Sequence, residues 1–287
     1  MRAEDVRKVG VVGCGLMGSG IVEVCARADL DVRYLEPTQQ LVERGRERIE
    51  ASTRRAVQGG KLDDGERTAL LARISATTEV EELADRDLVI EAATEDPGTK
   101  ASIFRALDGI LGPRVVLASN TSSIPIVDLG AATKRPDRVV GMHFFNPVPV
   151  MGLIEVVKAI TTSDETVELA RAFGAVLGKT TVLSKDRAGF IVNMLLIPYL
   201  NGAIRMLEED FASAEDIDAA VHLGLGHPMG PLRLLDLIGL DTALFVANVL
   251  FDEFKEPTFA PPPLLRRMVA AGQLGRKSGR GFYDYEP

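Results

Sequence analysis

Short apolar runs alternate with longer segments of helical periodicity through the first half of the chain. The short runs have the length and β-branched content of buried strands, whereas apolar residues three or four positions apart indicate amphipathic helices. Because strands that alternate with helices form parallel sheets, we predict a Rossmann-like, doubly wound and mostly parallel α/β sheet. The predicted strands are 8–12, 32–35, 87–92, 115–118, 139–140, 154–157 and 181–183.

The predicted helices fill the intervals between these strands. A long helical arm rich in arginine follows the second strand and breaks at Gln58-Gly59-Gly60, where two glycines interrupt the periodicity. Further helices are predicted at 62–73, 100–107 and 164–177.

The pattern changes near Lys185, where strand-like runs stop and helical periodicity takes over. Helices are predicted there at 190–207, 214–223 and 231–250. We therefore predict two domains, 1–185 and 186–287, of which the second is all-α. Its helices carry more apolar faces than a domain of this size buries by itself, which predicts a homodimer through this domain.

A glycine-rich turn joins the first predicted strand to the first predicted helix. The sequence Gly13-Cys14-Gly15-Leu16-Met17-Gly18 is a G-x-G-x-x-G, the fingerprint of a dinucleotide-binding turn. The first glycine permits the tight turn, the second lets the backbone approach a pyrophosphate, and the third allows close packing of helix on strand. The helix N-terminus offers free N–H groups to the phosphates. The predicted cofactor contacts in this turn are Gly13, Gly15, Leu16, Met17 and Gly18.

An acidic residue, Glu36, ends the second predicted strand. At this position a carboxylate accepts hydrogen bonds from the adenosine ribose hydroxyls and repels a 2′-phosphate. The order of strand, glycines, helix, strand and acid therefore predicts NAD rather than NADP as the cofactor. Arg33, earlier on the same strand, keeps the NADP alternative open because guanidinium groups suit phosphates.

His143 is one of three histidines in the chain and directly follows an apolar run at 138–141. It lies at the end of a predicted buried strand, where open α/β sheets hold their ligands. Glu155 is on the next strand-like run, and the Pro-rich turn between the runs would allow the two side chains to meet. An imidazole oriented by a carboxylate serves as a general base, so this pair is the predicted acid–base site. The alternative is a core histidine satisfied by a backbone carbonyl.

The composition, with 46% hydrophobic and 26% charged residues, is that of a globular enzyme. A formal net charge of −8 gives no support to a role in binding nucleic acid. The two cysteines, Cys14 and Cys25, fall in one strand–helix unit and are interpreted as small apolar residues rather than a disulfide. No signal-peptide pattern is present, and polar residues and a proline interrupt the apolar stretch 189–207. We expect a cytoplasmic protein that binds neither membranes nor metals.

Together these motifs resemble those of a short-chain L-3-hydroxyacyl-CoA dehydrogenase of the bacterial 3-hydroxybutyryl-CoA type. The resemblance spans essentially the whole chain. It rests on the glycine turn 13–18 and on the segments 91–95, 119–123, 142–147, 186–193, 230–236 and 275–279. It implies the reversible oxidation of a (3S)-3-hydroxyacyl-CoA to the 3-oxoacyl-CoA by NAD.

The resemblance also implies roles for individual residues. His143 takes the 3-hydroxyl proton, and Glu155 stabilises the imidazolium as it forms. Ser122 and Asn193 are expected to act in catalysis by hydrogen-bonding the substrate oxygens. Ser122 and Asn146 are expected near the nicotinamide ribose or amide. Further cofactor contacts implied by the resemblance are Glu95, Lys100 and Lys277.

The helical arm after the second strand departs from the family pattern. Family members commonly carry lysines there that bind the CoA phosphates. Ser52 fits a CoA-contacting position, but the lysine expected further on aligns with Gly59. Arg54, Arg55 or Lys61 can substitute, because a flexible cation reaches a phosphate from several positions, and the sequence leaves the choice among them open.

Two other functions are compatible with the fold. A related dehydrogenase of a non-CoA hydroxy acid or sugar acid commonly uses a lysine base four positions before an asparagine. Here the residue four positions before Asn193 is Gly189, so that mechanism lacks its base. The second alternative is a non-catalytic NAD-binding protein on the same fold, against which the His143/Glu155 pair argues.

Overall fold

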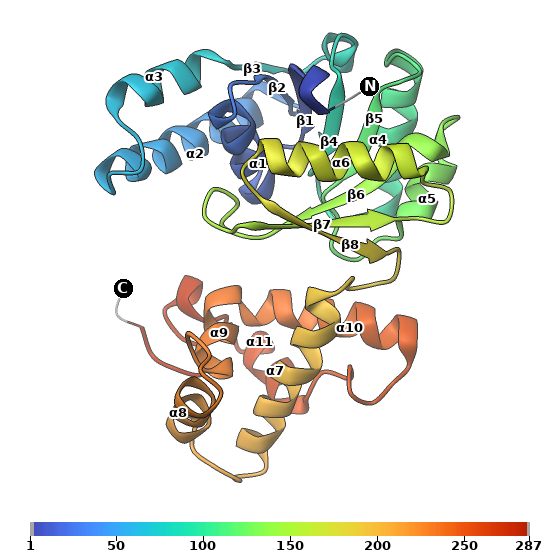
Figure 1. The fold of residues 1–287 in the computed structure, drawn as a ribbon. Helices are drawn as coiled ribbons and strands as arrows, with labels where there is room; N and C mark the ends of the chain where they lie inside the picture. The colour runs from blue at the N-terminus through green and yellow to red at the C-terminus, as the bar shows by residue number, and fades with distance from the viewer. Residues whose placement is uncertain (1–2, 286–287) are drawn as a thin grey trace. The chain divides into compact units, whose positions relative to one another are not determined.

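Eight strands form one twisted sheet in the computed structural model, which describes residues 3–285 (Figure 1). The strand order is β3-β2-β1-β4-β5-β6-β7-β8. All neighbouring pairs are parallel except β6 and β7, which confirms the prediction of a mostly parallel sheet. The strands are β1 (Lys8–Val12), β2 (Asp31–Leu35), β3 (Ile74–Thr77), β4 (Leu88–Glu91), β5 (Val116–Ser119), β6 (Val139–Phe144), β7 (Leu153–Lys158) and β8 (Thr180–Lys185).

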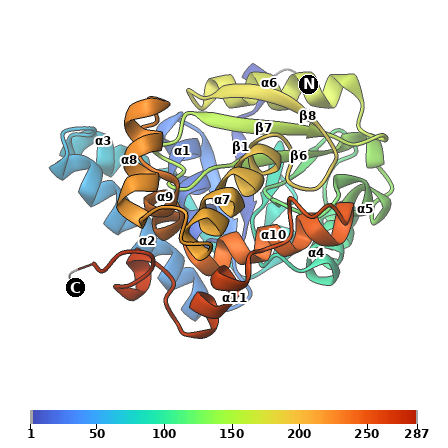
Figure 2. The same ribbon diagram turned by 90° about the horizontal axis from the view of Figure 1, so that it is seen from below.

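Helices cover both faces of this sheet. Residues of α1 and α6 share one apolar cluster with the strands, whereas α4 and α5 pack on each other and lie on the opposite side from α6 (Figure 2). The helices here are α1 (Leu16–Arg27), α2 (Gln39–Gln58), α3 (Asp64–Ala72), α4 (Pro97–Ile110), α5 (Ile126–Ala131) and α6 (Asp164–Val176). Three 3-10 turns, η1 (Ala3–Asp5), η2 (Val80–Leu83) and η3 (Pro136–Arg138), complete the described part of this unit.

The chain divides into two compact units, Met1–Arg187 and Ala188–Pro287. The second unit is helical over its described residues, with its own apolar core around Leu200, Leu235 and Leu240. Its helices are α7 (Val192–Glu208), α8 (Ala214–Gly224), α9 (Pro231–Ile238), α10 (Leu240–Phe254) and α11 (Pro263–Ala270), followed by the 3-10 turn η4 (Arg276–Ser278).

The structure corrects several predicted elements. The sequence predicts one helix at 231–250, but Gly239 has φ of +100° and separates α9 from α10, which meet at a bend of 97°. Gly189 and Phe190 also have positive φ, so α7 begins at Val192 rather than at Phe190. The pattern does not predict β3, because its four residues are half polar, and it also misses the short helices α5 and α11.

Within residues 3–285, no single helix combines the length and the apolar character needed to cross a membrane. The bent α9–α10 pair meets that test only when both helices are counted together.

Candidate active site

The glycine turn lies between β1 and α1 and has the geometry that its sequence predicts. Gly13 has φ of +89°, and a Cβ there would lie 2.8 Å from the carbonyl oxygen of Ala92. A Cβ on Gly18 would lie 1.8 Å from the carbonyl oxygen of Gly13, so this helix position accepts no side chain. A Cβ on Gly15, in contrast, would have no other atom within 4 Å, and Gly15 leads directly into α1. The turn therefore leaves open space at the helix N-terminus, as an incoming diphosphate requires.

Glu36 is buried against this turn, directly after β2. Its Oε1 accepts a hydrogen bond from the backbone N–H of Cys14 at 2.5 Å. Arg33 points elsewhere, since its Nε donates to Ser75 Oγ at 3.2 Å and its Nη1 donates to the carbonyl of Glu82 at 2.7 Å. The cation that the sequence leaves open as a 2′-phosphate ligand is therefore engaged by β3 and η2.

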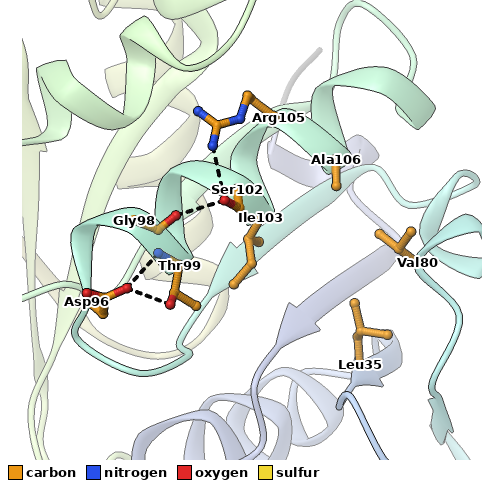
Figure 3. A pocket seen from close by; sticks show the side chains of 9 residues that line it. All are labelled: Leu35, Val80, Asp96, Gly98, Thr99, Ser102, Ile103, Arg105 and Ala106. Atoms are coloured by element: carbon orange, nitrogen blue, oxygen red, sulfur yellow. Dashed lines mark hydrogen bonds between the residues drawn. The ribbon is translucent and has the colours of Figure 1, made fainter.

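A cavity of about 830 Å³ opens beside the end of β2 (Figure 3). Its apolar lining comes from Leu35, Val80 and Ile103, and its polar lining comes mainly from the first turns of α4. Asp96 caps that helix by accepting from the backbone N–H of Thr99 at 2.7 Å. This hollow is open and mostly apolar with a polar rim, and Leu35 in its lining directly precedes the buried Glu36. Such a lining has the chemistry to hold a flat base and its ribose.

His143 and Glu155 meet across the antiparallel pair formed by β6 and β7. The register places the two residues directly opposite each other, and Nδ1 of the imidazole lies 2.7 Å from Oε2 of the carboxylate. Glu155 is completely buried, and the His143 ring packs against Phe145 with its centroid 4.6 Å away. The expectation that two strands bring these side chains together is confirmed. A carboxylate at this distance from Nδ1 favours the tautomer that carries its proton on Nδ1.

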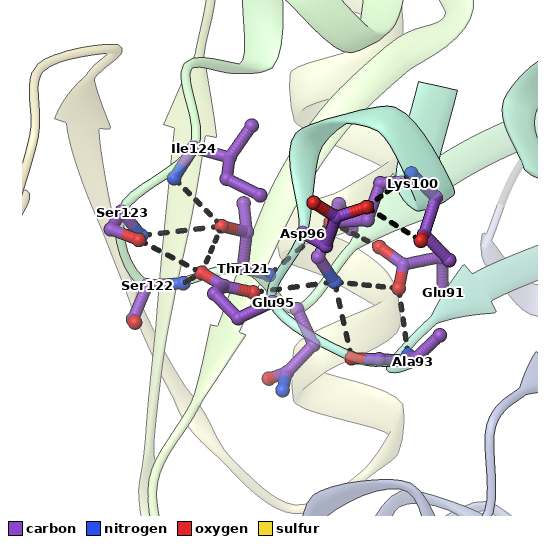
Figure 4. Close-up of polar contacts among 12 residues, drawn as sticks. Glu91, Ala93, Glu95, Asp96, Lys100, Thr121, Ser122, Ser123 and Ile124 are labelled. Atoms are coloured by element: carbon purple, nitrogen blue, oxygen red, sulfur yellow. Dashed lines mark hydrogen bonds and ion pairs between the residues drawn. The ribbon is translucent and has the colours of Figure 1, made fainter. Parts of the chain in front are cut away.

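A buried ion pair links the carboxyl ends of β4 and β5 to α4 (Figure 4). Lys100 Nζ lies 2.6 Å from Glu91 Oε1, and both side chains are at most 1% exposed. Glu91 also accepts from the backbone N–H of Ala93 at 2.7 Å and from Ser119 Oγ at 2.6 Å. Every charge in this pair is compensated, and removing one partner of such a pair typically costs about 3–5 kcal/mol.

Glu95 extends this ion pair to the loop after β5. Its Oε2 lies 3.3 Å from Lys100 Nζ, and its Oε1 accepts from Thr121 Oγ1 at 2.5 Å, from the Ser122 backbone N–H at 3.0 Å and from Ser123 Oγ at 3.0 Å. Burial acts to raise the pKa of the Glu95 carboxyl, but the Lys100 ammonium and the three loop donors outweigh it and lower that pKa. The carboxylate therefore stays charged and fixes the loop.

The other predicted site residues lie on other elements of the two units. Asn146 precedes Pro147 in the turn between β6 and β7. Ser52 is half-buried on α2, and Lys61 is exposed just after that helix. Asn193 lies in the first turn of α7, and Lys277 pairs with Asp241 at 2.5 and 2.6 Å; both belong to the second unit.

The sequence analysis includes the segments 91–95 and 119–123 in the resemblance but assigns no individual role to four residues of the polar cluster around Glu95. The missing members are Glu91, Ser119, Thr121 and Ser123. Each lies at or just past the carboxyl end of β4 or β5, so the signal was a polar residue at the end of a predicted buried strand.

Both cysteines are expected to be inert toward alkylation in the native protein. Burial is the main cause that raises the pKa of Cys14, and also that of Cys25, to about 12. The reactive thiolate is therefore scarcer by roughly 10³-fold than in an unperturbed thiol. Mass spectrometry after iodoacetamide treatment at pH 8 should show no adduct on folded protein and two adducts in guanidinium chloride. Rapid labelling of the folded protein would contradict this prediction.

The sheet, the glycine turn and the buried acid at the end of β2 define a Rossmann-type dinucleotide-binding protein. The family model for the NAD binding domain of 3-hydroxyacyl-CoA dehydrogenase matches residues 8–187, and the model for the C-terminal domain matches residues 189–285. The chain belongs to the 3-hydroxyacyl-CoA dehydrogenase family, a family of oxidoreductases.

Similar proteins match over their full length. The 3-hydroxybutyryl-CoA dehydrogenase of Mycobacterium tuberculosis is 54% identical over 285 residues, which cover 99% of this chain and 100% of that protein. The crystal structure of FadB2 from M. tuberculosis matches with a TM-score of 0.96 at 55% identity and covers 98% of this chain and 99% of that one. The structure of (S)-3-hydroxybutyryl-CoA dehydrogenase PaaH1 from Ralstonia eutropha matches with a TM-score of 0.93 at 46% identity, covering 99% and 100%.

Proposed function

We propose that this protein catalyses the reversible, NAD-dependent oxidation of a (3S)-3-hydroxyacyl-CoA to the 3-oxoacyl-CoA, with short chains such as 3-hydroxybutyryl-CoA as substrates. The observation that carries the proposal is the 2.7 Å contact between His143 and Glu155 at the carboxyl edge of the sheet. Support for the short-chain substrate comes from the relatives at 54% and 46% identity, which are named 3-hydroxybutyryl-CoA dehydrogenases.

The residues of the first unit fit NAD. The open turn at Gly15 suits the diphosphate, Leu16 and Met17 follow it at the start of α1, and Glu36 suits the adenosine ribose. We assign the nicotinamide end to Glu95, Ser122 and Asn146, and a contact from the tail to Lys277. When bound, NAD supplies the acceptor for the hydride that leaves C3 of the substrate.

In this proposal His143 is the general base. Its Nε2 takes the proton of the 3-hydroxyl group, and the buried Glu155 carboxylate stabilises the imidazolium that forms, because a desolvated opposite charge lies 2.7 Å away. In the reductive direction His143 returns the proton to the oxygen at C3. Ser122 and Asn193 donate hydrogen bonds to the substrate oxygens and favour the alkoxide.

We assign the CoA end of the substrate to one face of α2. Residues 48, 52 and 55 are spaced four and three positions apart, so Arg48, Ser52 and Arg55 lie along a single face of the helix. Arg54 lies about 100° away around the helix axis and belongs to another face. Arg55, next to Ser52, is therefore our choice among the candidate cations, and Lys61 is a second contact beyond the end of the helix.

Arg55→Ala is expected to raise KM for acetoacetyl-CoA on the order of tenfold, because the variant loses one hydrogen bond to a charged phosphate. Arg54→Ala is the matched control and should change this KM less than twofold. Acetoacetyl-pantetheine lacks the nucleotide, so its KM should be the same for both variants and the unmodified protein. Steady-state kinetics with the two thioesters decide the assignment, and an equal effect of both variants would refute it.

The function itself is tested by mixing the purified protein with NADH and acetoacetyl-CoA and following the nicotinamide absorbance. A fall in absorbance with acetoacetyl-CoA, and none with free acetoacetate, supports the proposal. Turnover of free acetoacetate in preference to the thioester indicates a non-CoA dehydrogenase. NADH binding without turnover of either substrate indicates a non-catalytic binding protein.

We propose further that the protein is a homodimer formed through its second unit. Large apolar side chains are exposed there on or beside α7 and α8, among them Leu195, Phe211, Leu223 and Leu225. Such a surface is typical of a subunit interface. Light scattering after size exclusion should give about twice the 30.9 kDa of one chain, and a monomer mass at micromolar concentration would argue against the dimer.

A further inference from the structure

The Lys100 ammonium group is buried and is held by groups of this chain. The side chain is 1% exposed, and its ammonium group lies near three acceptors of this chain. These are Glu91 Oε1 at 2.6 Å, Glu95 Oε2 at 3.3 Å and the carbonyl oxygen of Ala93 at 3.4 Å. This environment differs from the direct contact with the cofactor that the sequence analysis suggests for Lys100.

One end of the cluster is anchored in the sheet. Glu91 is the last residue of β4, and its Oε2 accepts a hydrogen bond from Oγ of Ser119, the last residue of β5. Its Oε1 accepts another from the backbone N–H of Ala93. Both strands are buried, and the Glu91 carboxylate is completely buried between them and α4. It holds the Lys100 ammonium at a defined distance from the edge of the sheet.

The other end of the cluster holds the loop that contains Ser122. Glu95 Oε1 takes one hydrogen bond from each of three consecutive residues, 121–123. Thr121 Oγ1 in turn accepts from the backbone N–H of Ser123 at 3.2 Å and of Ile124 at 2.8 Å. The cluster holds Ser122 by its backbone, and its side chain points away from the carboxylates (Figure 4).

We propose that Lys100 is a positioning residue that acts through Glu95: it holds the Glu95 carboxylate in place, and that carboxylate sets the position of the Ser122 hydroxyl for the reaction. This inference rests on the proposed function, which assigns Ser122 to the substrate and the nicotinamide end. It replaces a direct contact of Lys100 with the cofactor by a chain of contacts from β4 to the loop. Lys100 supplies a fixed charge, and Ser122 supplies the hydroxyl.

The test is a comparison of Glu95→Gln, the charge-neutral pair Glu91→Gln/Lys100→Met, and the triple variant. Replacing both members of the buried pair avoids leaving one charge unpaired. Lys8→Met removes a surface ion pair with Asp85 and is the control for loss of a paired lysine. The readout is turnover of acetoacetyl-CoA and NADH per NADH-binding site, measured by fluorescence titration, because partial unfolding lowers the number of sites but not the turnover of each site.

We expect each of the first two variants to lose on the order of tenfold in kcat per site. The triple variant should also lose about tenfold, because both changes act through the same contact. A loss near a hundredfold in the triple variant shows that Lys100 and Glu95 act independently and overturns the inference. Full turnover in the neutral pair variant overturns it too. An unmodified protein that does not turn over acetoacetyl-CoA refutes the proposed function instead, so the two failures are distinct.

A measurement on the unmodified protein keeps the inference testable if the pair variant does not fold. Reductive methylation with peptide mass mapping should leave Lys100 unmodified with and without NADH, while Lys8 and Lys61 react in the free protein. Modification of Lys100 in the free protein, with protection by NADH, would mean that the cofactor covers its ammonium group and would overturn the positioning role.

Discussion

His143→Ala is expected to lower kcat by about 10² to 10⁴-fold, the usual contribution of a positioned acid–base group. The imidazole is held by Glu155 at 2.7 Å and is nearly buried, so water replaces it poorly as a proton acceptor. NADH binding should barely change, because the glycine turn and Glu36 are left intact. Steady-state rates with acetoacetyl-CoA, together with NADH titration, check both parts of the expectation.

Glu155→Gln is the matched control for this prediction. It keeps the size of the side chain and an acceptor oxygen beside Nδ1 but removes the charge that stabilises the imidazolium. Its loss of turnover should be smaller than or equal to that of His143→Ala. Near-native turnover of His143→Ala would remove this histidine from the mechanism, and full activity of Glu155→Gln would give the carboxylate a purely structural role.

The unmodified protein is expected to prefer NAD(H) over NADP(H) by on the order of 10² to 10³-fold in kcat/KM. Glu36 lies buried beside the glycine turn, where its carboxylate gains hydroxyl contacts from NAD and meets a phosphate of like charge in NADP. Arg33 does not offset that repulsion, because its guanidinium group is bonded to Ser75 and Glu82. Measuring kcat/KM for both cofactors tests the preference.

Two variants separate the charge of Glu36 from its structural contact. Glu36→Gln keeps an acceptor for the Cys14 N–H and should relax the preference toward NADP while NAD remains usable. Glu36→Ala loses that acceptor as well and should lower efficiency with NAD while it relaxes toward NADP. Equal use of both cofactors by the unmodified protein would mean that Glu36 does not reach the ribose.

The glycine turn and its strands were predictable because their signal is local. Gly13 needs a positive φ and Gly18 needs the absence of a Cβ, and both requirements act within one strand–turn–helix segment. The His143–Glu155 contact was predictable for a related reason: two adjacent strands joined by a short turn must lie side by side. The break at Gly239 was missed because the apolar periodicity continues on both sides of it.

The contacts within the cluster around Lys100 lay beyond what the sequence could predict. Its members come from β4, α4, the end of β5 and the loop after β5. The contacts join residues up to 28 positions apart and depend on how the parallel strands align. The register places Glu91 beside Ser119, and this alignment brings the buried Lys100 ammonium close to the carboxylates of Glu91 and Glu95. No periodicity or motif records that alignment.

The amino-acid sequence by itself determined the class of fold, the turn that suits a dinucleotide, the acid that is predicted to select NAD and the pairing of His143 with Glu155. These follow from backbone sterics, side-chain periodicity and short connections, which act between residues that are near one another in the chain. Tertiary structure alone decided that Lys100 is buried between Glu91 and Glu95, and that Arg33 is engaged by neighbouring elements. The availability of a charged side chain for a ligand depends on which other groups the fold brings within hydrogen-bond distance, and residues far apart in the chain supply those groups.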